Sequence, residues 1–192
     1  MKYYQNVLFS LQNKLNFSIL TKQCLTVISA VTILGISANV YIPVVPVPFS
    51  LQSLSVLLVG IMLNKKLSII SILLYIALGL IGLPMFAEGS SGFNVLFAPS
   101  FGYIVGLVGA TYILSIANSK IQQGNFGFIQ YFVYLLIAHQ TIFVFGVLWL
   151  SVVLGSLKLG FLYGYLPFIG WDLLKIALAT NISWLFHRSM NK

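Results

Sequence analysis

The stretch PFIGWDLLKIALATNISWLF, residues 167–186, decides how this chain folds, because nearly all of its residues are apolar. A stretch of roughly 20 such residues crosses the hydrocarbon core of a bilayer as one helix. It nevertheless holds an acid and a base three residues apart, Asp172 and Lys175. The chain has only one other acidic residue, Glu88. The stretch therefore predicts a membrane helix with a charged pair that needs an explanation.

The composition of the whole chain points the same way. It has 192 residues, of which 59% are hydrophobic and 6% charged, and its mean hydropathy is +1.02. A soluble domain carries about 25% charged residues, so this chain cannot cover a water-facing surface. The single cysteine, Cys24, forms no internal disulfide and is interpreted as a small apolar residue. We expect an integral membrane protein.

The apolar runs predict an all-α, polytopic fold with six transmembrane helices in one bundle. Pro43 and Pro84 end two of the runs, as expected of a residue that cannot continue a helix. The six predicted spans are 24–42, 51–63, 67–83, 103–117, 128–154 and 166–186. The first run is too long for a signal peptide and no small-residue cleavage site follows it, so we expect no cleaved leader.

The placement of lysine and arginine predicts the orientation. Basic residues collect in cytoplasmic loops, and a cytoplasmic N-terminus puts eight of them inside and only Lys158 in an outer loop. Those eight are Lys2, Lys14, Lys22, Lys65, Lys66, Lys120, Arg188 and Lys192. We therefore expect both termini in the cytoplasm and outward loops at 43–50, 84–102 and 155–165. The net charge of +8 then reflects topology and not a nucleic-acid partner.

The N-terminal residues 1–22 differ from the predicted six-helix domain of residues 23–192. Apolar residues recur there at helical spacing with lysines around them, which is typical of a helix lying in the membrane interface. A flexible tail and a cytoplasmic continuation of the first span are the alternatives.

Asp172 and Lys175 fall within the first turns of the last helix, near its outer end. Residues three apart share a helix face, so both groups point the same way. One interpretation is a salt bridge that neutralises itself. The other is a ligand site, because leucine at both positions would insert into the membrane more cheaply. A carboxylate accepts hydrogen bonds and an ammonium donates them, which suits an amide-like or ureido-like ligand.

Two other polar residues, His139 and Gln140, lie in the middle of the fifth predicted span. A proton relay would need further titratable groups, so interhelical hydrogen bonding by this neutral His–Gln pair is favoured. The sequence has no G-x-x-x-x-G-K-[ST] phosphate loop and no Cys/His metal cluster. We therefore predict a protein that is not an enzyme and needs no metal or cofactor.

Four segments occur in an order that is similar to a known family. They are IPVVPVPFSLQSLSVLLVG (42–60), LLYIALGLIGLPMFAEGSSG (73–92), APSFGYIVG (98–106) and PFIGWDLLK (167–175). Together they resemble the biotin-specific substrate-binding membrane subunit, the S component or BioY family, of energy-coupling-factor (ECF) transporters. The resemblance covers roughly residues 24–186.

The resemblance implies biotin bound near the outer face of a prokaryotic plasma membrane. It also implies partners, namely a transmembrane coupling subunit and two ATPase subunits. The family's D-x-x-K pair lies in its biotin site and maps onto Asp172 and Lys175. Asp172 would accept from the ureido ring and Lys175 would donate to it.

The remaining site residues implied by the resemblance depart partly from the family. Some members carry an asparagine where Ser90 stands and an arginine where Ile104 stands. The biotin carboxylate would then be held by Ser90, Ser91, Tyr103 or backbone N–H groups. Gln52 and Phe49 would close the pocket, or merely shape a proline turn.

The family's first helix docks on the coupling subunit through small residues four apart. Here that row consists of Ala30, Leu34 and Ala38, with packing inside the bundle or against lipid as the alternative. A stand-alone facilitator or secondary transporter is the competing function, although the sequence has no internal repeat that would support it. A membrane subunit without a ligand is a third alternative, which the pair Asp172 and Lys175 argues against.

Overall fold

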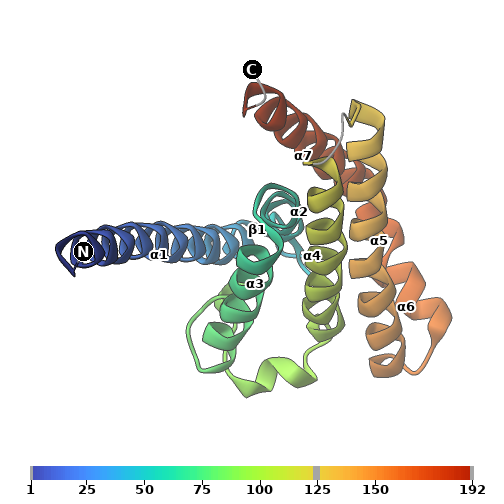
Figure 1. The fold of residues 1–192 in the computed structure, drawn as a ribbon. Coiled ribbons are helices and arrows are strands. Elements are labelled where there is room, and N and C mark those ends of the chain that lie inside the picture. Colours follow the sequence, from blue (N-terminus) through green and yellow to red (C-terminus); the bar gives the residue numbers. More distant parts are fainter. Residues whose placement is uncertain (1, 123–125, 191–192) are drawn as a thin grey trace.

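The structure, a computed structural model, describes residues 2–122 and 126–190; the side chains of residues 2–17 and 190 lie outside the described part. It is built almost entirely from α-helices (Figure 1). The α-helices are α1 Lys2–Asn39, α2 Gln52–Met62, α3 Lys65–Leu80, α4 Phe101–Ile121, α5 Phe128–Val153, α6 Leu157–Gly164 and α7 Ile169–Met190. Short 3₁₀ helices span Ala87–Gly89, Phe93–Phe97 and Leu166–Phe168, and strands β1 Tyr41–Ile42 and β2 Phe49–Ser50 pair antiparallel.

The helices confirm an all-α, multi-pass membrane protein. Four segments are long and apolar enough to cross a bilayer: Ser18–Asn39, Phe101–Ile121, Phe128–Val153 and Leu157–Ser189. The helix α2 is shorter but also apolar. Each of the six predicted spans contains a helix, and the ends shift by a few residues except at α1, which begins at Lys2 instead of residue 24. For example, α3 begins at Lys65 because the Asn64 side chain accepts from the Leu67 N–H at 3.0 Å and caps the helix.

The predicted outward loop at 155–165 contains a short helix, α6. The Ser156 side chain caps this helix by accepting from the Leu159 N–H at 3.4 Å. The apolar stretch of α6 is too short to cross a membrane as a helix of its own. Nevertheless, α6 packs on α5.

The N-terminal segment continues α1 without a break in the helix, from Lys2 to Asn39. Figure 1 shows α1 extending sideways, away from the bundle formed by the other helices. The prediction that residues 1–22 lie in the membrane interface depends on side chains that mostly fall outside the described part. It therefore stays a prediction, as does the boundary at residue 23.

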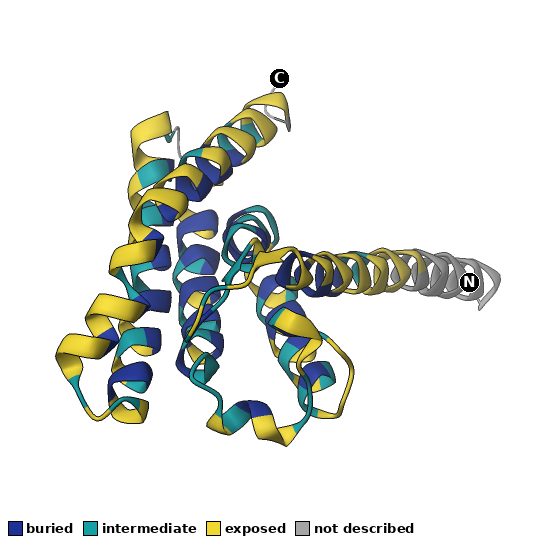
Figure 2. Cartoon of the chain, turned by 180° about the vertical axis from the view of Figure 1, so that it is seen from behind, coloured by how far each residue is buried: buried dark blue, intermediate teal, exposed yellow. Residues whose placement is uncertain are grey.

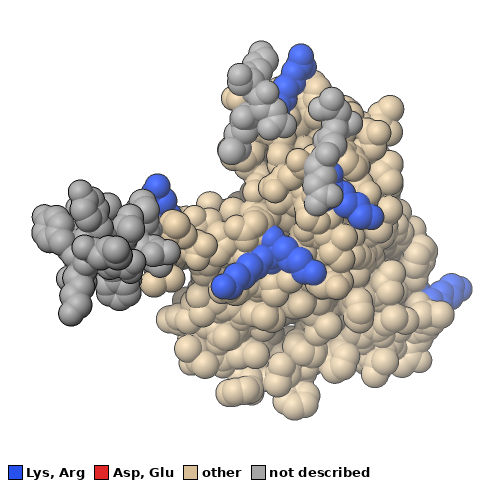
Figure 3. Space-filling model, viewed as in Figure 1, with Lys and Arg blue, Asp and Glu red and all other residues tan. Residues whose placement is uncertain are grey.

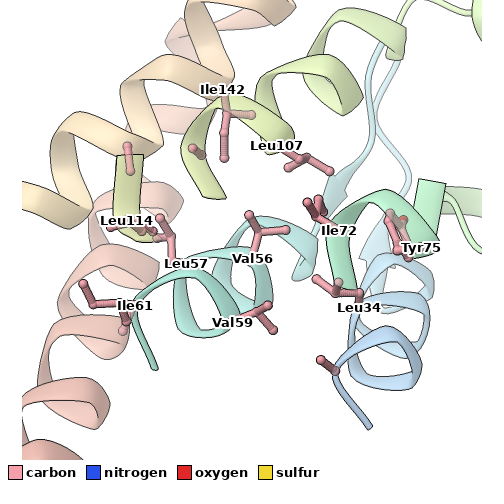
Figure 4. Packing of buried hydrophobic residues seen from close by; sticks show 14 of the residues in the cluster. Leu34, Val56, Leu57, Val59, Ile61, Ile72, Tyr75, Leu107, Leu114 and Ile142 are labelled. Atoms are coloured by element: carbon pink, nitrogen blue, oxygen red, sulfur yellow. The ribbon is translucent and has the colours of Figure 1, made fainter. Parts of the chain in front are cut away.

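The core is centred on the short helix α2. Its residues Val56, Leu57 and Ile61 are fully buried, and α2 contacts α1, α4, α5 and α7. Figure 4 shows apolar side chains from several helices converging around α2, including Leu34 of α1 and Leu114 of α4. A helix of only about three turns is thus stabilised by neighbours on several sides.

Glycines let α4 and α5 approach closely. A Cβ atom added at Gly106 would lie 2.6 Å from the Ile142 Cα atom, and one at Gly102 would lie 2.4 Å from the Phe145 carbonyl oxygen. Small residues four apart allow two membrane helices to pack backbone against backbone. This contact holds the two helices that form one wall of the cavity described below.

The outer surface is apolar. Exposed residues cover the outward faces of the helices (Figure 2), and many of them are large and hydrophobic, such as Ile36, Leu148 and Leu174. Lysine and arginine side chains are few on the face shown in Figure 3 and stand apart on an otherwise uncharged surface. Such a surface fits a lipid environment, in which helices satisfy their own backbone hydrogen bonds.

Candidate functional site

A cavity lies between α2, α4, α5 and α7, in the half of the bundle that carries the first turns of α4 and α7. Its unfilled space is about 650 Å³, counting its open mouth. The segments 43–50 and 84–92 contribute Val47, Pro48, Phe86 and Ala87 to its wall. By the predicted orientation this is the outer half. The resemblance placed the ligand in the same half.

Asp172 and Lys175 both line this cavity and are almost fully buried. The Lys175 Nζ atom donates to the Asp172 Oδ1 atom at 2.9 Å. It also donates to the Ser50 carbonyl oxygen at 2.8 Å and to the Ser53 Oγ atom at 3.2 Å. The pair therefore joins the start of α7 to strand β2 and the start of α2.

The three contacts of Lys175 bear on its role as a donor to a ligand, which stays a prediction. An ammonium group has three N–H donors, and all three are engaged by protein atoms in this arrangement. In this structure Lys175 therefore has no N–H group left to donate to a ligand. The physical reason is that β2 brings a backbone carbonyl next to the ammonium group, which the sequence pattern did not reveal.

His139 is a site residue that the sequence analysis missed. It lines the cavity and is 1% exposed, and its Nε2 atom lies 3.5 Å from the Asp172 Oδ1 atom. Of the interhelical hydrogen bonds predicted for His139 and Gln140, only the one of Gln140 forms in the described part of the chain. Gln140 accepts from the Tyr165 hydroxyl at 3.0 Å while His139 lines the cavity, because consecutive helix residues point in different directions. A histidine in the middle of a membrane span, with no evident partner in the sequence, was the signal that could have pointed to this site.

Two polar groups of this cluster have atoms without a partner. Within residues 2–122 and 126–190, the Asp172 Oδ2 atom and both ring nitrogens of His139 are buried and make no hydrogen bond. Buried polar atoms are normally satisfied. An acceptor and an imidazole left open side by side in a cavity indicate a site for a ligand that supplies the missing partners.

Aromatic rings form the apolar wall. Tyr103, Phe143 and Phe168 line the cavity, and the ring centroids of Phe143 and Phe168 are 5.7 Å apart. Phe49 packs edge-on against Phe168 at 4.3 Å without lining the cavity itself. The Tyr103 hydroxyl donates to the Gly164 carbonyl oxygen at 2.7 Å, so α6 holds this ring in place.

The other predicted ligand residues divide into two groups. Gln52 lines the cavity and donates to the Tyr75 hydroxyl at 2.8 Å, and Tyr75 in turn donates to the Met85 carbonyl oxygen at 2.9 Å. Ser90 is exposed, with its hydroxyl on the Ala87 carbonyl oxygen at 2.7 Å, and Ser91 is half-buried. Neither serine lines the cavity, because the turn at 87–89 directs them away from it.

The loop at 84–92 is also tied to α1. The Asn39 side chain donates to the Pro84 carbonyl oxygen at 3.1 Å and accepts from the Gly89 N–H at 2.9 Å. Gly89 has a φ of 67°, a left-handed conformation that glycine adopts without strain. The end of α1 therefore sets the position of a loop that closes the cavity.

The predicted partner-contact row faces inward. Ala30, Leu34 and Ala38 are 5%, 0% and 0% exposed, because α1 packs this face on α2 and α3. Packing inside the bundle, the alternative stated for this row, describes their position. No cluster of three or more metal-ligating side chains exists in the described part of the chain.

Comparisons with known proteins agree with this architecture. The model of the BioY family matches residues 9–192. The probable biotin transporter BioY of Pyrococcus horikoshii is 33% identical over 153 residues, which cover 80% of this chain and 88% of that protein. The biotin transporter BioY2 of Lactococcus lactis is 32% identical over 164 residues, covering 83% and 86%.

A solved structure is similar over almost the whole length. The crystal structure of the S component for biotin from an ECF-type ABC transporter superposes with a TM-score of 0.76 and 25% identity. The superposition covers 92% of this chain and 94% of that one. With the family model matching nearly every residue, the chain belongs to the BioY family.

Proposed function

We propose that this chain binds biotin in the cavity beside Asp172 and serves as the substrate-binding S component of an ECF-type vitamin importer in the plasma membrane. A separate transmembrane coupling subunit and two ATPase subunits would drive the inward delivery. The observation that carries the proposal is a buried acid–base pair, with one open carboxylate oxygen, in an otherwise apolar cavity of a BioY family member.

The chemistry of biotin suits the two kinds of wall. Its ureido ring presents N–H donors to a carboxylate, and Asp172 has an unpartnered Oδ2 atom to accept one. Its fused sulfur-containing ring and aliphatic chain are apolar and would lie against Tyr103, Phe143 and Phe168. Ligand sites in proteins commonly combine apolar walls with a few directed polar groups.

The carboxylate end of biotin would lie at the cavity mouth. Its donors would be Ser91, Ser90 or backbone N–H groups of the glycine turn, which belong to the loop that contributes Ala87 to the wall. The Ser90 and Tyr103 hydroxyls already donate to the Ala87 and Gly164 carbonyl oxygens, so each would have to exchange that bond for one to the carboxylate. Gln52 and Phe49 would fix the wall opposite this loop.

Titration calorimetry on the detergent-solubilised chain tests the binding step. The chain alone is expected to bind biotin, and Asn181→Ala, an exposed position on α7, is expected to bind equally well. Absence of biotin binding by the folded wild-type chain would refute the proposal.

Reconstituted vesicles test the energy source. Vesicles that contain only this chain are expected to bind biotin without accumulating it, because the sequence has no phosphate-binding loop. Sustained accumulation without ATPase subunits would instead support the competing function, a stand-alone transporter.

A further inference from the structure

We propose that His139, and not Lys175, donates the hydrogen bond to the carbonyl oxygen of the bound ring, and that Lys175 is a positioning residue. This inference rests on the proposed function, since it concerns the ureido group of biotin. It assigns to a histidine on α5 the role that the spacing of Asp172 and Lys175 had suggested for the lysine.

The first step concerns the donors of Lys175. Its ammonium contacts Ser50, Ser53 and Asp172 at 2.8, 3.2 and 2.9 Å, which uses its three N–H groups. A ligand carbonyl could bind to Lys175 only by displacing one of these contacts. Lys175 therefore acts on the ligand indirectly, by holding the Asp172 Oδ1 atom and leaving the Oδ2 atom open.

The second step concerns the donor that remains free. A neutral imidazole carries one N–H donor and one acceptor nitrogen. Both ring nitrogens of His139 are buried without a partner in the described part of the chain, and the ring is held against Phe143 with a centroid separation of 5.2 Å. The nearest acceptor is the Asp172 Oδ1 atom, 3.5 Å from Nε2, and Lys175 already holds that oxygen at 2.9 Å.

The third step is geometric. In a ureido group a single carbon separates the N–H groups from the carbonyl oxygen, so the donor for the carbonyl must stand next to the acceptor for the N–H. The His139 Nε2 atom lies 3.5 Å from the Asp172 Oδ1 atom, and the open Oδ2 atom belongs to the same carboxylate. An imidazole donor and a carboxylate acceptor therefore stand next to each other in the cavity.

Other donors on the wall are less suitable. The Tyr103 hydroxyl is bound to the Gly164 carbonyl oxygen, and one of the two N–H donors of the Gln52 amide is bound to the Tyr75 hydroxyl. Ser53 accepts from Lys175 and keeps its own hydroxyl proton, so it is the competing donor in direct contact with the Asp172–Lys175 pair. A test must therefore separate His139 from Ser53 as well as from Lys175.

The test combines affinity with a spectroscopic signature. Biotin labelled with ¹³C at the ureido carbonyl is titrated into wild type, His139→Leu, His139→Gln, Ser53→Ala and Lys175→Met, and isotope-edited infrared spectra of the bound ligand are recorded. A carbonyl stretch falls in frequency when its oxygen accepts a hydrogen bond. Each purified variant is compared at matched folded fraction, judged by its elution profile in detergent.

Loss of the donor should affect both readouts. His139→Leu is expected to bind biotin about 5- to 100-fold more weakly, because a buried carbonyl is left unsatisfied, and to shift the bound carbonyl band to higher frequency. His139→Gln, whose amide N–H can replace the imidazole donor, should recover much of both. Lys175→Met should weaken binding through Asp172 yet leave the carbonyl band near its wild-type position.

Three outcomes would overturn the inference. These are an unshifted band in His139→Leu, a band shift in Lys175→Met as large as the one expected for His139→Leu, or a shift confined to Ser53→Ala. In each of them wild type still binds biotin, so the proposed function survives. Failure of wild type to bind biotin would instead refute the proposed function itself.

Discussion

At Asp172, one carboxylate oxygen is held by Lys175 and the other has no partner in the described part of the chain. This asymmetry is what distinguishes a ligand site from a closed structural pair. Breaking a buried pair by removing one partner strongly destabilises a protein, because the other charge is left uncompensated. For substitutions at Asp172 and Lys175, the yield of folded protein and the affinity for biotin therefore have to be measured separately.

Asp172→Ala should weaken biotin binding more than Asp172→Asn. A hydrogen bond to a charged group is worth about 1.5–3 kcal/mol, which is about 10- to 150-fold in affinity. Asparagine keeps an oxygen that can accept, so its loss should be smaller. Titration calorimetry on folded protein measures both values, and equal binding by wild type and Asp172→Ala would contradict the site assignment.

The double variant Asp172→Asn with Lys175→Met separates the two interpretations of the pair. Lys175→Met alone should lower the yield of folded protein, since Asp172 loses its cation. The double variant should recover part of that yield, but not all, because the contacts to Ser50 and Ser53 are also lost. It should still bind biotin weakly; near-wild-type affinity at matched folded fraction would make the pair purely structural.

At the scale of the elements, the cavity depends on how closely its helices pack and on how its loops are tied down. The close contact of α4 and α5 positions Tyr103 and His139 in the wall that these two helices form. The loop at 84–92 is held by Asn39 from α1 and by Tyr75 from α3. Each of these connections can be broken by a change outside the cavity.

Gly106→Ala should lower the midpoint of thermal unfolding in detergent. The new Cβ atom would lie 2.6 Å from the Ile142 Cα atom, and such overpacking typically costs about 1–3 kcal/mol. Gly170→Ala is the matched control, because a Cβ atom there meets nothing within 4 Å and alanine favours a helix. An equal midpoint for the two variants would argue against backbone contact between α4 and α5.

Asn39→Ala should loosen the loop at 84–92. Its side chain bridges the Pro84 carbonyl oxygen and the Gly89 N–H, so removing it exposes this loop to faster hydrogen exchange. Asn181→Ala is the control, because the Asn181 side chain bonds only to its own helix, at the Ala177 carbonyl oxygen. Hydrogen-exchange mass spectrometry is expected to show faster exchange at 84–92 for Asn39→Ala alone, and unchanged protection would remove Asn39 as a tether.

At the scale of the whole molecule, two basic residues lie at the end of the bundle away from the cavity. Figure 1 shows the last turns of α4 and α7 at the same end. Lys120 and Arg188 belong to the last turns of α4 and α7. This polarity is what the positive-inside rule requires of a protein whose cavity opens outward.

Cysteine labelling in intact cells tests this orientation. In a Cys24→Ser background, a cysteine introduced at Lys158 should react with a membrane-impermeant reagent from outside, and one introduced at Lys66 should not. Both positions are exposed in the structure, so access to the reagent depends on the side of the membrane. Labelling of position 66 from outside would reverse the orientation.

The sequence by itself determined the class of fold and part of the site. Long apolar runs have no stable alternative to helices in lipid, so each predicted span contains a helix of the structure, and the charge pair at Asp172 and Lys175 stood out because buried charges are costly. Spacing within one helix was enough to bring these two residues together, since residues three apart share a face.

Only the tertiary structure decided what surrounds that pair. His139 and the Ser50 carbonyl oxygen reach it from α5 and β2, elements far away in the sequence, and no local pattern encodes which face of one helix meets another. The same reason turned Ala30 and Ala38 inward and left Ser90 outside the cavity wall. Side-chain partners across helices follow from how the whole bundle packs, which depends on all of its residues at once.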